Sequence, residues 1–150
     1  MTSELAAAHA ACAAGTLRRA SRSLTRLYDA HLARVGLTTM QFSILRMVQR
    51  RAGRIALADL ADDLAFERTS LYRALRPLQR AGLVSIRPCA DRRAREAVLT
   101  SRATRRIAAA MPHWAAAQRL VLSRLGAAEW SDLAGRIGHL TSIARQPDSE

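Results

Sequence analysis

The chain has 150 residues, which is long enough for one domain with a hydrophobic core. Hydrophobic residues make up 49% and aromatic residues only 4%, and alanine is abundant, so the composition favours close-packed helices over a sheet sandwich. All 24 basic residues are arginine, and against 12 acidic residues they give a formal charge of +12, which points to nucleic acid as a partner.

Membrane and export signals are not expected. No apolar run reaches the roughly 18 residues that a membrane helix needs. The alanine-rich start lacks the basic leading region of a signal peptide. The sequence therefore predicts a soluble, cytoplasmic protein.

The positive charge is concentrated in the middle of the chain. Fifteen arginines and six acidic residues lie between Arg46 and Arg106, a net charge of +9, whereas the rest of the chain carries only +3. We expect the partner to bind this central stretch.

Two helices are predicted first. Apolar residues recur at alternating three- and four-residue steps as far as Val35, which predicts one helix over about residues 5–35, ended by Gly36. Thr38 followed by Gln41 is typical of a capping box and predicts the start of a second helix. This helix should end near Gly53, and a short piece of strand is expected around residue 55.

A helix-turn-helix is predicted next. Residues 57–64 have the spacing of a short amphipathic helix, and a turn of about three residues (65–67) leads to a second helix over 68–80 that ends at Gly82. Two helices joined by so short a turn must cross steeply. Pro77 should remove one backbone hydrogen bond and bend the second helix.

A charged hairpin and two more helices complete the chain. Residues 83–87 and 96–100 predict two antiparallel strands with a polar, arginine-rich tip between them, which is the form of a wing. Thr100 is a good N-cap for a helix to about residue 124, kinked at Pro112. Gly126 marks a break before a last helix over 129–144, and both helices carry an apolar stripe.

The helix over 68–80 and the wing have the chemistry of a DNA reader. Arginine can bind guanine O6 and N7 as a bidentate pair in the major groove, and arginines of a wing can enter the negative minor groove. An aspartate at the tip would hold these arginines in place. The residues expected to contact DNA are Arg68, Thr69, Ser70, Tyr72, Arg73, Arg76, Arg87, Asp91, Arg92, Arg93 and Arg95.

The segments GLTTMQFSIL, LADLADDLAFERTSLYRALRPLQRAGLV and RPCADRRAREAVLT closely resemble the MarR (multiple antibiotic resistance regulator) family of bacterial winged-helix repressors, over about residues 15–144. The resemblance implies a mainly α fold with a small β-hairpin wing and a homodimer that binds a palindromic operator. The chain shows no internal repeat and no linker, which predicts one domain over residues 1–150. The resemblance implies dimerisation helices at about 5–35 and 101–145 and a DNA-binding lobe at about 38–100. Where the family often has glycine in the turn and aspartate after it, this chain has Ala65 or Phe66, and Glu67.

The resemblance also implies a switch, and the sequence leaves its nature open. Many members of the family are released from DNA by small phenolic or other aromatic ligands that bind between the dimer helices and the DNA-binding lobe. Polar and aromatic residues near that junction are the candidates to line such a site, although each alone is more often core or interface. They are Tyr28, His31, Gln41, Phe42, His113 and Trp114.

Cysteine oxidation is the alternative switch. A free cysteine is most often a small buried hydrophobe, which is the expectation for Cys12. Cys89 lies close in sequence to Arg87, Arg92 and Arg93, which would make it more reactive.

Other classes of protein fit less well. The chain has no glycine-rich phosphate loop, no G-x-S-x-G and no HExxH, so an enzyme is not expected. Its four histidines lack metal-like spacing, and no metal or cofactor is expected. An architectural protein that binds DNA without sequence preference remains an alternative.

Overall fold

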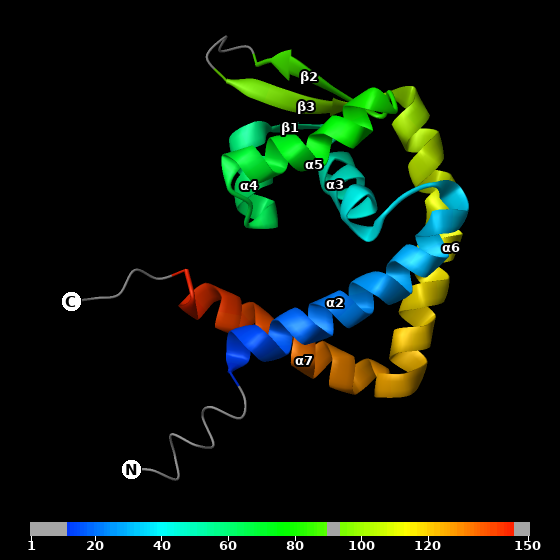
Figure 1. The fold of residues 1–150 in the computed structure, drawn as a ribbon, viewed down its shortest axis with the longest axis vertical. Helices are drawn as coiled ribbons and strands as arrows, with labels where there is room; N and C mark the ends of the chain where they lie inside the picture. Colours follow the sequence, from blue (N-terminus) through cyan, green and yellow to red (C-terminus); the bar gives the residue numbers. More distant parts are fainter. Residues whose placement is uncertain (1–11, 90–93, 146–150) are drawn as a thin grey trace, which may run out of the picture. The chain divides into compact units, whose positions relative to one another are not determined.

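The computed structural model describes residues 12–89 and 94–145. The chain divides into two compact units, Met1–Trp114 and Ala115–Glu150. The fold is mainly α with a small antiparallel sheet, as predicted (Figure 1). In order, its elements are α2 (Ala13–Leu32), the 3-10 turn η1 (Ala33–Val35), α3 (Thr39–Arg50), β1 (Arg54–Ala56), α4 (Leu57–Leu64), α5 (Arg68–Arg80), β2 (Val84–Pro88), β3 (Arg95–Leu99), α6 (Ser101–Leu125) and α7 (Ala127–Ile143).

The connection from α2 to α3 largely follows the sequence prediction. The α-helix ends at Leu32 and tightens into η1, so the expected continuous helix to residue 35 is wrong in its last turn. Gly36 follows in the left-handed conformation, with φ of +66°. The capping box is confirmed, because the Gln41 N–H donates to Thr38 Oγ1 at 3.2 Å and the Thr38 N–H donates to Gln41 Oε1 at 3.0 Å.

A side chain of α2 also fixes the start of α3. Asp29 Oδ1 accepts hydrogen bonds from the Thr39 N–H and from Thr39 Oγ1, both at 2.6 Å. Thr39 is the first residue of α3, where backbone N–H groups have no partner within the helix. One carboxylate of α2 therefore satisfies a donor at the helix start and joins the two helices.

The sheet has three strands, namely the two of the predicted hairpin and the short strand expected around residue 55. Its order is β1-β3-β2, and both pairs are antiparallel. Ala97 of β3 lies opposite Ile55 on one side and Ile86 on the other, and it is completely buried. The strand expected around residue 55 therefore extends the wing hairpin into a sheet that closes over the core.

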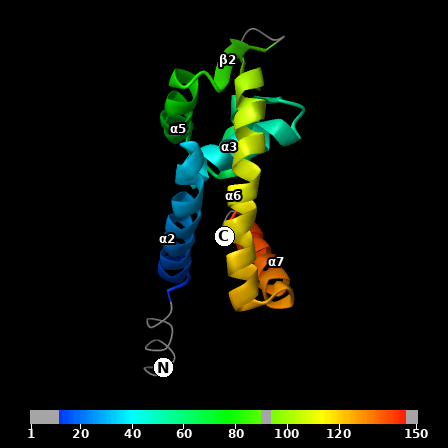
Figure 2. The same ribbon diagram turned by 90° about the vertical axis from the view of Figure 1, so that its right-hand side faces the viewer.

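The core of the first unit is built from the apolar faces of α3, α4 and α5 below this sheet, together with Leu32 from α2 and Ile107 from α6. Figure 2 shows α3 between the end of α2 and the first half of α6. Burial of each large aliphatic side chain contributes about 1.5–3 kcal/mol relative to its exposure. The largest side chains with less than 2% exposure are Leu32, Ile44, Leu45, Val48, Leu60, Leu71, Leu75, Leu78 and Ile107.

The turn between α4 and α5 keeps its geometry without a glycine. Ala65 adopts the left-handed conformation with φ of +51°, which costs about 1–2 kcal/mol for a residue with a side chain. The Phe66 N–H donates to the Ala61 carbonyl at 2.8 Å and closes the turn. The departure from the family pattern at this position is therefore absorbed as local backbone strain. Pro77 lies within α5, which continues to Arg80.

The second unit contains the end of α6 and α7. Gly126, with φ of +99°, separates these helices, as predicted. Along the predicted stripe of α7, Trp130 and Ile137 are half-buried, whereas Leu133 and Leu140 are 41% and 38% exposed. No helix in the described part of the chain is long and apolar enough to span a membrane.

Candidate nucleic-acid interface

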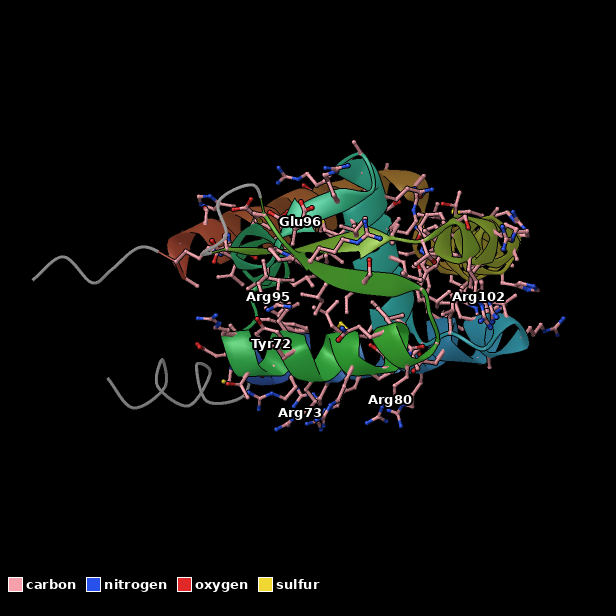
Figure 3. The ribbon with its side chains drawn as sticks, turned by 90° about the horizontal axis from the view of Figure 1, so that it is seen from above. Tyr72, Arg73, Arg80, Arg95, Glu96 and Arg102 are labelled. Carbon is pink, nitrogen blue, oxygen red and sulfur yellow. The ribbon has the colours of Figure 1, made fainter. Side chains whose placement is uncertain are left out.

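The helix α5 has one buried face and one basic face. Leu71, Leu75 and Leu78 are at most 1% exposed and hold the helix against the core. The residues on the other side are exposed, and α5 contains no acidic residue. Figure 3 shows Arg73 and Arg80 projecting away from the sheet. The predicted contact residues that are exposed on α5 are Arg68, Thr69, Ser70, Arg73 and Arg76.

Tyr72 differs from the other predicted contact residues because it is half-buried and packs against the core. Together with Arg68 and Arg95 it lines a hollow of about 500 Å³ between α4, the first turns of α5 and the base of the wing. Tyr72 on α5 and Arg95 on β3 face each other across this space (Figure 3). Three predicted contact residues from two elements thus meet at one place.

The base of the wing is ordered by strand pairing. Arg87 pairs with Glu96 and Pro88 with Arg95 in the register of β2 and β3. The Cys89 N–H donates to the Ala94 carbonyl at 2.9 Å, which closes the hairpin. Arg87 and Arg95 are exposed at this base. The remaining predicted wing residues, Asp91, Arg92 and Arg93, lie outside the described residues.

The predicted ligand residues come together only in part. The rings of Phe42 and Trp114 lie with centroids 6.4 Å apart and planes tilted by 33°. They line a hollow of about 220 Å³ together with Ser43, Arg46, Met47 and Arg50.

The other four candidates have different surroundings. Tyr28 and His31 are half-buried on α2, and burial raises the pKa of the Tyr28 hydroxyl above its usual value. Gln41 uses its side-chain oxygen in the capping box. His113 is half-buried on α6. The lining of the hollow between α3 and α6 therefore shares only Phe42 and Trp114 with the predicted set.

Sequence reasoning missed the arginines of this hollow. Arg46 and Arg50 are one turn apart on α3, a spacing that places them on one face, and α3 has no acidic residue. Arg46 Nη1 donates to Gln49 Oε1 at 2.7 Å. The i, i+4 spacing of Arg46 and Arg50 was the sequence signal for this basic face. The sequence of α3 does not say which other helix lies against it.

The two cysteines lie in different settings. Cys12 is exposed at the N-cap of α2, so the expectation that it would be a buried hydrophobe is wrong for this chain. Cys89 is half-buried at the end of β2, next to the wing.

Comparison with known proteins identifies the family. A family model described as a winged helix DNA-binding domain matches residues 37–103. The search of curated proteins gave no match. Among solved structures, the chain is similar to the transcriptional regulator MosR of M. tuberculosis in complex with DNA, with 32% identity over 90% of this chain and 99% of that chain and a TM-score of 0.78.

Two further crystal structures share the fold. AbsC, a MarR family transcriptional regulator from Streptomyces coelicolor, is 26% identical, with 89% of this chain and 93% of that chain covered and a TM-score of 0.78. A mutant of MarR from E. coli complexed with operator DNA is 20% identical, with coverage of 89% and 96% and a TM-score of 0.78. With the basic face of α5 and the three-stranded wing sheet, these matches show that the chain belongs to the MarR family of winged-helix, DNA-binding transcriptional regulators.

Proposed function

We propose that the protein is a repressor that binds a palindromic operator as a homodimer and is released by a small aromatic ligand. In this proposal the first turns of α5 enter the major groove and contact base edges. The wing arginines enter the neighbouring minor groove. Asp91 orients those arginines by charge-assisted hydrogen bonds.

The observation that carries this proposal is the face of α5. Its leucines are buried on one side, and its hydroxyls and arginines are exposed on the other. A helix that only stabilised the core would not need four arginines and no acid on its outer face. The exposed side chains supply the hydrogen-bond donors that the acceptor oxygens of phosphates and the O6 and N7 atoms of guanine require.

A second copy of the chain is supported by the apolar face of α7. Leu133, Leu140 and Ile143 are 41%, 38% and 50% exposed on this helix. Large aliphatic side chains at helical spacing are typical of a helix that packs against a partner. A dimer would present two copies of α5 to two half-sites about 10 base pairs apart.

The proposed ligand site is the hollow between α3 and α6. About 220 Å³ is smaller than the cavities of roughly 300–1,000 Å³ that hold drug-sized ligands, so a compound with one aromatic ring is the class that fits. Phe42 and Trp114 offer ring contacts, and Arg46 and Arg50 offer partners for an anionic group. Benzoate is therefore a suitable probe.

The ligand proposal is tested by fluorescence. Trp130→Phe leaves Trp114 as the single tryptophan, and benzoate should change its emission in a saturable way. Arg46→Gln with Arg50→Gln should abolish that change, whereas cyclohexanol should give none. A benzoate response that survives the double arginine variant would contradict the proposed site.

DNA reading is tested by selecting duplexes from a random pool with the full-length protein. We expect the selected sequences to contain two inverted half-sites. Arg73→Ala should relax the preference at one position of each half-site, by about 1–3 kcal/mol for a lost bidentate contact. Failure to enrich any sequence would refute the proposal and favour an architectural DNA-binding protein.

A further inference from the structure

A second basic surface lies at the start of α6, outside the helix-turn-helix and the wing. Arg102, Arg105 and Arg106 stand at i, i+3 and i+4 and so share one face of the helix. They lie with Ala109 on an open part of the helix surface. The charged residues described on this surface are all arginines. The helix α6 itself contains no acidic residue.

The start of α6 is fixed to the end of α5 by Thr100. Thr100 Oγ1 accepts a hydrogen bond from the Ala103 N–H at 3.2 Å, which caps α6. The same hydroxyl donates to the Gly82 carbonyl at 2.8 Å, in the turn that follows α5. The position of these arginines is therefore tied to the position of α5.

The Arg102 guanidinium lies over this turn. A side-chain carbon built on Gly82 would stand 4.0 Å from Arg102 Nη1, which is ordinary contact distance. In Figure 3 Arg102 lies beyond the carboxyl-terminal end of α5, past Arg80. Arg102 thus stands beside the turn at which α5 and its basic face end, and in this sense the two surfaces are continuous.

The three arginines have different roles. Arg106 is half-buried and its guanidinium donates to the Val35 carbonyl, so it ties α6 to η1. Arg102 and Arg105 are exposed. Cations that share one face repel one another, and an anion bound between them removes this repulsion and gains charge-assisted hydrogen bonds.

We propose that Arg102 and Arg105 bind the DNA sugar-phosphate backbone beside the half-site that α5 reads, beyond the carboxyl-terminal end of that helix. This inference rests on the proposed function, because α5 must lie in the major groove for the surface to face the same duplex. DNA is favoured over an acidic protein segment by the continuity with the face of α5. Contacts with phosphate fix position on the duplex but carry no sequence information.

The test compares salt dependence in two double variants of the full-length protein. Arg102→Gln with Arg105→Gln removes the proposed contacts and leaves Arg106 in place. Arg119→Gln with Arg124→Gln removes the same charge from exposed positions further along α6 and is the matched control. Binding to the selected operator and to random duplex is measured between 0.05 and 0.3 M salt (on the order of the range in which counterion release is resolved).

Two arginines in each of two subunits make four phosphate contacts. Each phosphate contact contributes about 0.9 to the slope of log K against log salt concentration, so this slope should become shallower by about 3.6 in the first double variant. In the control the slope should remain near that of the wild type. Affinity for operator and for random duplex should fall by the same factor, so that their ratio stays unchanged. Hydroxyl-radical protection should be lost only at the flanking sugars.

The other possible results separate a failure of this inference from a failure of the proposed function. Equal slopes in the two double variants, with the wild type still specific for its operator, would overturn this inference and leave the proposed function standing. Absence of specificity in the wild type would instead refute the proposed function. A change in oligomer mass without a change in DNA affinity would assign the surface to a protein partner. If the first variant is less stable in thermal unfolding, methylphosphonates at the flanking positions test the same contacts with the wild type, and unchanged wild-type affinity would overturn the inference.

Discussion

Asp29→Ala should destabilise the protein by breaking the connection between α2 and α3. Asp29 Oδ1 accepts two hydrogen bonds from Thr39, one from the backbone N–H and one from the hydroxyl, each at 2.6 Å. A hydrogen bond to a charged group contributes about 1.5–3 kcal/mol net. Asp29 is only half-buried, so water replaces part of the interaction, and we expect a total loss of about 2–3 kcal/mol.

The assay is urea unfolding followed by far-ultraviolet circular dichroism. All variants are compared at one protein concentration, because the stability of the proposed dimer would depend on it. Asp29→Asn keeps an amide oxygen as acceptor but loses the charge, which is favourable at the start of α3, so its loss should be about 1 kcal/mol.

Arg51→Ala is the control. Arg51 Nη2 forms an ion pair with Asp63 Oδ2 at 3.1 Å, away from α7, and the Arg51 side chain is 55% exposed. Exposed pairs contribute about 0–1 kcal/mol, so this variant should unfold almost like the wild type. A loss for Asp29→Ala within about 0.5 kcal/mol of the control would refute the reasoning, since that is the usual scatter of surface substitutions.

Three further predictions concern the wing, the cysteines and pH. Arg92→Ala with Arg93→Ala should weaken operator binding and make its salt dependence shallower, as measured by fluorescence anisotropy; unchanged affinity in the double variant would remove the wing from the interface. If oxidation is the switch, peroxide should release the wild type from DNA, and the serine variant of the sensor cysteine, Cys12→Ser or Cys89→Ser, should stay bound. A wild type that stays bound in peroxide would exclude this switch. Burial raises the pKa of Tyr28 in the folded protein above 10, its value in the unfolded chain. Above about pH 10 the unfolded chain therefore loses this proton more readily than the folded protein does, and the free energy of unfolding falls as pH rises towards the folded pKa. Tyr28→Phe should therefore lose less stability than the wild type in urea titrations between about pH 9 and 11, and identical losses would contradict the burial effect.

Helix ends could be predicted because their chemistry is local. Thr38 and Gln41 are three residues apart, and both hydrogen bonds of the capping box are present. Gly36 and Thr100 also act as expected, the first in a left-handed conformation and the second as an N-cap. Each of these features depends on atoms within one helical turn.

Features that depend on distant pairing could not be predicted. The strand Arg54–Ala56 pairs with β3, about forty residues later in the sequence, which no local pattern specifies. Ala65 takes a left-handed conformation that alanine does not signal, because the surrounding helices impose it.

The same distinction holds for the candidate site. The basic face of α5 followed from the alternation of leucine and arginine along one helix, so sequence alone was sufficient to describe it. The hollow between α3 and α6 required Phe42 to meet Trp114 from another helix. Its arginines, Arg46 and Arg50, gained meaning only once that neighbour was known.

The central claim is sequence-specific DNA reading by the exposed face of α5. The most direct measurement is competition between the selected operator and random duplex for the full-length protein at 0.15 M salt (roughly physiological ionic strength), with the mass of the complex determined in the same sample. We predict two chains per duplex and a preference for the operator of at least about 1,000-fold, which Arg73→Ala reduces. Equal affinity for the two duplexes, or a single chain bound to one asymmetric site, would contradict it.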